Sequence, residues 1–298
     1  MISYSLPDFT VALDLNLMFA QLMRQSPEMF LDDVRVASVY GCFPGCVMNG
    51  GRAFVRERYD AAQIDATFTA VERAGLKTRL TFTNMLAGEE QFGDEYFNLI
   101  LHVADDHDVE VIVYSDALDD YIARDHSFAR TLSTTRQILE PGEMNAALGR
   151  YDMVVLNYDL NKSDLFLMQV SDPTRLEVMP NELCNPHCPY RQRHYLHNSA
   201  DQLAGRVTPF RPCSHEGAGF TTRTADSPTL LGNDDVRRLN ATYGIESFKI
   251  VGRGVTSDLT LESYLYYLVR PEHRAGLEAA LRRMGRPAGA GRPAATAE

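Results

Sequence analysis

The stretch DAAQIDATFTAVERAGLKTRLTFT, residues 60–83, decides the fold class. Its first part places Ile64, Phe68 and Val71 at helical spacing, and Gly75 follows as a typical helix C-cap. Its second part, Thr78–Thr83, is short, nearly apolar and rich in β-branched residues, which is typical of a strand buried in a parallel sheet. An amphipathic helix followed directly by a buried strand predicts an α/β fold.

The same alternation recurs along the 298 residues. Amphipathic helical patterns cover residues 94–107 and 259–269, and short apolar runs lie between the helical segments. Eight alternations predict a closed (β/α)8 TIM-like barrel that forms a single domain over residues 1–284. The Ala/Gly/Pro-rich tail, residues 285–298, is predicted to be disordered. The eight expected strands are Phe9–Leu15, Val34–Tyr40, Thr78–Thr83, Val109–Tyr114, Arg130–Thr135, Met153–Asn157, Arg175–Met179 and Ser247–Val251.

Composition excludes several classes of function. The net charge of -11 and the absence of a long Lys/Arg run argue against a nucleic-acid partner. No apolar stretch approaches the roughly 20 residues needed to span a bilayer, so we expect no membrane span. The N-terminal residues lack a signal-peptide pattern, and we therefore expect a cytoplasmic protein whose thiols stay reduced.

Two predicted connections are unusually long, and they hold every cysteine of the chain. The Gly-rich segment 41–60 follows the second strand and contains Cys42 and Cys46. The segment 180–245 follows the seventh strand and contains Cys184, Cys188 and Cys213. In a (β/α)8 barrel both connections lie at the carboxyl ends of the strands, where active sites are found. Long connections in compact domains tend to be functional, so the cysteines are predicted to form a site at this mouth.

Thiolates in such numbers predict a metal. Cys184, Cys188 and Cys213, with Cys42 or Cys46 as the fourth ligand, match the four-cysteine ligation of an iron–sulfur cluster. The alternative is zinc, because His187, His194, His197 and His215 lie close by in sequence and zinc accepts mixed Cys and His ligands. A third interpretation is a surface loop without metal.

Two short motifs resemble a known family. ESFKIVGR, residues 246–253, is similar to a strand near the end of U32 peptidase-like proteins, and NELCNPHCPYRQRHY, residues 181–195, resembles their cysteine-bearing strand end. Relatives in that family include collagenase-like peptidases and the iron–sulfur proteins of oxygen-independent ubiquinone hydroxylation. The resemblance implies a barrel with a [4Fe–4S] site. The chain departs from the peptidase pattern, because it lacks the C-x4-G-x-C arrangement and has Val251 where the family has a glutamate.

These observations predict an iron–sulfur redox enzyme that acts on a small organic substrate, with oxygen-independent hydroxylation as the reaction that the resemblance implies. Arg191 and Arg193 are expected to offset the negative cluster or to bind an anionic substrate, and Glu182 and Arg253 lie at predicted strand ends. One alternative is a metal-dependent hydrolase with Glu182 or Glu216 as general base. Another is a non-catalytic, metal-stabilised subunit of a heteromeric complex. The expected partners are a small-molecule substrate and a protein partner or electron donor.

Overall fold

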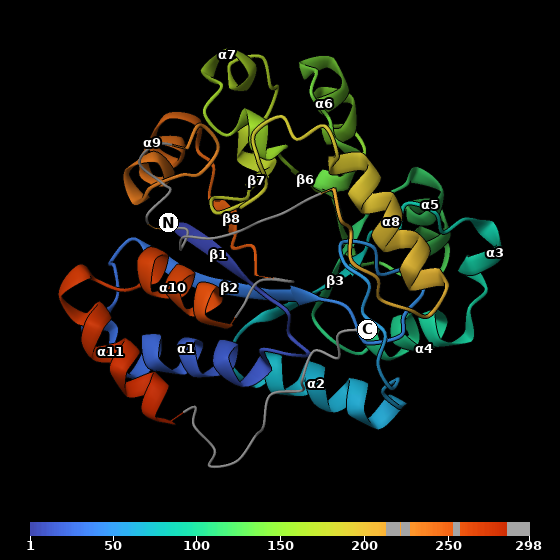
Figure 1. The fold of residues 1–298 in the computed structure, drawn as a ribbon, viewed down its shortest axis with the longest axis horizontal. Coiled ribbons are helices and arrows are strands. Elements are labelled where there is room, and N and C mark those ends of the chain that lie inside the picture. Colours follow the sequence, from blue (N-terminus) through green and yellow to red (C-terminus); the bar gives the residue numbers. More distant parts are fainter. Residues whose placement is uncertain (213–220, 222–226, 253–256, 285–298) are drawn as a thin grey trace.

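Eight parallel strands close into a barrel in this computed structural model, which describes residues 1–212, 221, 227–252 and 257–284 (Figure 1). The strands follow one another around the barrel in chain order, and β8 pairs with β1 to close it. This confirms the predicted (β/α)8 barrel. The strands are β1 (Ile2–Pro7), β2 (Val34–Gly41), β3 (Lys77–Phe82), β4 (Val109–Val113), β5 (Ala129–Leu132), β6 (Met153–Val155), β7 (Leu176–Val178) and β8 (Ser247–Lys249).

Helices surround the barrel on the outside, as Figure 1 shows. In α2, Ile64, Phe68 and Val71 are buried as predicted, Asp60 caps the first turn, and Gly75 adopts a left-handed φ of 71° beyond the last. No helix in the described part of the chain combines the length and apolar character that crossing a membrane requires. The helices are α1 (Leu13–Gln25), α2 (Ala61–Arg73), α3 (Glu89–Phe92), α4 (Glu95–Ala104), α5 (Asp116–Asp125), α6 (Pro141–Leu148), α7 (Asp164–Leu167), α8 (Arg191–Leu203), α9 (Asn233–Tyr243), α10 (Ser257–Leu268) and α11 (Pro271–Met284). Short 3₁₀ turns cover Pro27–Met29, Thr134–Arg136, Tyr158–Leu160 and Pro173–Arg175.

The prediction of the first strand was wrong. The strand is Ile2–Pro7, and the expected segment Phe9–Leu15 instead contains a turn and the start of α1. Asp8 ends the strand with a left-handed φ of 64°. All six residues of β1 are buried, including Ser3 and Ser5, so its polar residues made the segment look unlike a buried strand.

Charged side chains fill part of the barrel interior. Arg79 of β3 is ion-paired with Glu177 of β7 and Glu110 of β4, and it donates hydrogen bonds to Ser5 and Thr131 of two further strands. These strands lie on different sides of the barrel, so Arg79 reaches across its centre. Breaking a buried pair of this kind by removing one partner is strongly destabilising, because the other charge is left in a dry interior.

The connections after β2 and β7 meet over the barrel mouth. The segment between β2 and α2 holds the first cysteine pair, and the segment between β7 and β8 contains α8 and α9. Helix α8 crosses the mouth from the β6–β7 side toward α3 and α4 (Figure 1). Its C-terminal half holds the β2 segment, because Asn198 donates to the Gly51 carbonyl, and Gln202 accepts from the Phe54 N–H and donates to the Cys46 carbonyl. The tail 285–298 lies outside the described residues.

Candidate functional site

Cys184 and Cys188 lie together at the barrel mouth. Cys184 is buried in a small apolar cluster with Val155, Tyr158 and Met179, and half-buried Cys188 packs against the same cluster. Both thiols therefore belong to one side of the mouth, above β6 and β7.

The segment after β7 that carries Cys184 and Cys188, here called the cysteine loop, is fixed at its start by one buried side chain. Asn181 follows β7 and exchanges two hydrogen bonds with the backbone of Val251, just after β8, at 2.9 and 2.6 Å. This pairing ties the beginning of the loop to the end of the neighbouring strand. The cysteines that follow are thus carried on an anchored segment.

An ion pair stands beside Cys184. Arg191, at the start of α8, contacts Glu182 at 2.8 Å, and both side chains are only 13% exposed. The guanidinium lies between the rings of Tyr158 and Tyr195, at 4.6 and 4.7 Å from their centroids. Burial opposes the charge of Arg191, but Glu182 outweighs it and raises the pKa of Arg191 well above its usual value. This cation is therefore committed to neighbours within the protein.

The thiol of Cys184 feels two opposing effects. Burial raises its pKa above the ordinary value, while the guanidinium of Arg191 and the hydroxyl of Tyr158 oppose that rise. The Glu182 carboxylate also accepts the backbone N–H of Cys184 at 3.1 Å. A thiolate formed here, or a metal bound to it, would be stabilised by the positive charge of Arg191.

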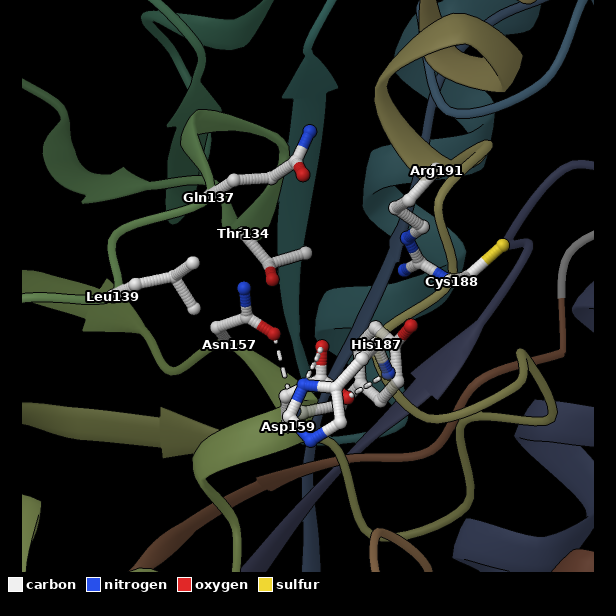
Figure 2. A pocket seen from close by; sticks show the side chains of 9 residues that line it. Thr134, Gln137, Leu139, Asn157, Asp159, His187, Cys188 and Arg191 are labelled. Atoms are coloured by element: carbon white, nitrogen blue, oxygen red, sulfur yellow. Dashed lines mark hydrogen bonds and ion pairs between the residues drawn. The ribbon is translucent and has the colours of Figure 1, made fainter.

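A cavity of about 220 Å³ lies next to these cysteines (Figure 2). It opens at the carboxyl ends of β5 and β6, the place that the barrel fold predicts for an active site. Its lining carries side chains with hydrogen-bonding groups, one aliphatic side chain and one thiol. These residues are Thr134, Gln137, Leu139, Asn157, Tyr158, Asp159, His187, Cys188 and Arg191.

Two cavity residues hold strained backbones. Gln137 has a φ of 56° and His187 a φ of 49°, values that residues with a Cβ seldom adopt. Asp159 stabilises the second of these, because its carboxylate accepts the His187 N–H at 2.8 Å and lies 3.7 Å from the ring Nδ1. Strain of this kind persists where the surrounding structure requires it and concentrates at functional sites.

The early cysteines lie elsewhere. Cys42 and Cys46 are buried in the main hydrophobic core, next to α4. Burial raises the pKa of Tyr96 to about 12, and the two neighbouring thiols add to this rise. Gln202, which holds the Cys46 carbonyl, is eleven residues beyond Arg191, a rise of about 16 Å along α8. The two cysteine pairs therefore stand near opposite ends of one helix.

Within the described ranges, no group of three or more His, Cys, Asp or Glu side chains is arranged to hold a metal ion. Cys213 and Arg253, which the sequence places in the site, lie outside those ranges, as do His215 and Glu216. Arg193 lies on the exposed side of α8, with its guanidinium 5.8 Å from the ring centroid of Tyr190. The structure thus brings Cys184, Cys188, Glu182 and Arg191 together, and leaves Cys42, Cys46 and Arg193 apart from them.

Sequence reasoning recognised part of the cavity. Asn157 ends the predicted sixth strand, Asp159 follows it, and His187 is one of the histidines that lie close to the cysteines in sequence. Thr134 and Gln137 were not predicted to take part. A polar residue in a short turn does not by itself indicate a functional site. The left-handed backbone of Gln137 cannot be predicted from the sequence either, because neither Gln137 nor the Ile138 that follows favours it.

Comparison with solved structures identifies a protein of similar fold. The solved structure of the U32 peptidase Mk0906 matches this chain with a TM-score of 0.55 at 13% sequence identity, covering 86% of this chain and 94% of that one. No protein-family model and no curated protein matched the sequence. At this identity the likeness shows that the chain has a U32-like barrel fold and shows nothing of its chemistry.

Proposed function

We propose that this barrel is an iron–sulfur redox enzyme, with a [4Fe–4S] cluster bound at the loop after β7. Cys184, Cys188 and Cys213 supply its thiolates, and a small organic substrate binds in the adjacent cavity. The observation that carries the proposal is the convergence of the Cys184 and Cys188 side chains on one apolar cluster beside that cavity. Soft thiolate ligands in an apolar setting suit iron–sulfur clusters.

The structure describes two of the three proposed ligands, Cys184 and Cys188. Two thiols of the set lie together, and neither early cysteine joins them in the described structure. Because α8 separates the early pair from the later pair, we propose that the ligands come from the β7 loop and that Cys42 and Cys46 are core residues. This departs from the expectation that Cys42 or Cys46 is the fourth ligand.

The residues around the cysteines have roles that do not depend on the reaction. Burial raises the pKa of the Cys184 thiol, and the fixed positive charge of Arg191 offsets part of this rise, which helps the thiolate that metal binding needs. Tyr158 and Tyr195 sandwich the guanidinium and limit the access of water to this side of the loop. A bound cluster would supply one-electron transfer, at a potential that the nearby cation raises.

The hydrolase alternative places a general base at Glu182. That carboxylate accepts the Cys184 N–H and is ion-paired with Arg191, so accepting a proton would cost it the ion pair. Such a group is better suited to positioning the loop than to proton transfer. The Glu182–Arg191 pair therefore favours the redox proposal over this form of hydrolysis.

The test is anaerobic purification with iron, acid-labile sulfide and zinc analysis, followed by electron paramagnetic resonance of the reduced protein. Cys184→Ser and Cys188→Ser should each lose most of the iron, whereas the matched variants Cys42→Ser and Cys46→Ser should retain it. Stoichiometric zinc without iron would refute the proposal. Retention of iron in both Cys184→Ser and Cys188→Ser would also refute it.

A further inference from the structure

The cavity beside Cys188 carries one feature that metal binding does not explain. Asn157 is 6% exposed and lines the cavity, and its Oδ1 accepts the Asp159 N–H at 3.1 Å. Its amide nitrogen, Nδ2, donates to no other residue of the described chain. This nitrogen is not one of the fully buried unpaired atoms of the described chain, so it is reached from the cavity that Asn157 lines and is placed to donate to an acceptor bound there.

Further neutral groups face the same space. Figure 2 shows Thr134 and Gln137 on the same side of the cavity as Asn157. Thr134 makes one long hydrogen bond, at 3.5 Å, to the Leu156 carbonyl, and the side-chain amide of Gln137 has no partner within the described residues. The strained backbone of Gln137 keeps that side chain at the cavity. This wall therefore presents uncharged donors and acceptors.

Arg191, the cation of the lining, is compensated within the protein, whereas the Asp159 carboxylate keeps its charge. Arg191 is paired with Glu182, and Asp159 is occupied by the backbone N–H of His187. A carboxylate or phosphate entering the cavity would meet the Asp159 charge without an uncommitted guanidinium to balance it. Electrostatics therefore disfavours an anion in this cavity.

We propose that the cavity binds a small uncharged molecule with a carbonyl group, whose oxygen accepts the hydrogen bond from Asn157 Nδ2. Gln137 pairs with a second polar group of the ligand, and the exposed side chain of Leu139 contacts its apolar part. A cavity of about 220 Å³ suits a ligand of this size class. That the ligand is also the substrate of the redox reaction rests on the function proposed above.

The experiment uses ligand-observed NMR and thermal shift on the full chain, with and without iron. The probes are small aromatic and aliphatic amides and their matched carboxylates, headed by benzamide and benzoate. Amides should bind more tightly than carboxylates, and Asn157→Asp should weaken amide binding roughly tenfold or more. This variant keeps an oxygen that accepts from the Asp159 N–H, but it replaces the donor by an acceptor and adds one negative charge. Asn185→Asp, an equal charge change at an exposed neighbouring position, should leave amide binding unchanged.

Three results would overturn the inference: carboxylates that bind more tightly than their amides, amide binding that survives in Asn157→Asp, or no binding by any probe. The outcome is separable from that of the cluster proposal. Amide binding to protein that holds no iron supports the cavity assignment while the redox proposal fails. If iron is lost only in the Cys184 and Cys188 variants and no amide binds, the redox proposal stands and the cavity assignment fails.

Discussion

Removing the cation beside Cys184 should destabilise the protein by a measurable and specific amount. Arg191→Met keeps most of the aliphatic volume but removes the partner of Glu182 and the charge between two tyrosine rings. Removing one member of a buried pair costs about 3–5 kcal/mol. Because both side chains keep 13% exposure, we expect the lower end, about 3 kcal/mol. At about 2 °C per kcal/mol for a chain of this size, the melting temperature should fall by roughly 6 °C.

Two comparisons make this prediction specific. Arg193→Met, two residues along the same helix, removes an exposed arginine and should change the stability by no more than about 0.5 kcal/mol. A double-mutant cycle with Glu182→Gln should give a coupling energy of about 1.5 kcal/mol by denaturant titration. If Arg191→Met and Arg193→Met lower the melting temperature equally, or the coupling energy is zero, the ion pair does not stabilise the cysteine loop.

Two further substitutions test the mouth and the helix that crosses it. Gly50→Ala would place a Cβ 2.1 Å from the Thr83 carbonyl oxygen and should cost about 3 kcal/mol of unfolding free energy, whereas Gly88→Ala, with nothing within 4 Å, should be nearly neutral by denaturant titration. Burial pushes the pKa of Asp201 up, but hydrogen bonds, chiefly from Thr208, outweigh this and lower it. The stability from this carboxylate is then present above its unfolded pKa of about 3.9 and is lost as pH falls through the lowered folded value. Asp201→Asn should therefore remove part of the acid sensitivity seen in melting curves between about pH 2 and 5, and an unchanged pH profile would contradict this assignment.

The barrel was predictable because each unit repeats one local physical pattern. In residues 60–83, helical spacing, a C-capping glycine and a β-branched run all indicate the same structure, and the structure agrees. The first strand escaped recognition because its polar residues point into a barrel whose interior is itself charged. Ser5 contacts Ser38 and Arg79 there, and no local rule reports a partner 74 residues away.

The sequence predicts which connections carry the site, but not how those connections are placed relative to each other. The strand order places Cys184 and Cys188 at the mouth, and both lie there. The sequence has no means of showing that a thirteen-residue helix would stand between the two cysteine pairs, because the direction of α8 is set by hydrogen bonds from Asn198 and Gln202 to a distant segment. The cavity beside Cys188 depends on tertiary placement in the same way.

Helix α8 also limits how this barrel can be altered. In many barrels of this type, the loops at the mouth are independent modules, and one is exchanged without disturbing the next. Here the second connection and the seventh are joined by the contacts of Asn198 and Gln202, so each supports the other. Transplanting the cysteine loop onto a related scaffold would require transplanting residues 41–60 with it, and the two connections would be inherited as a pair.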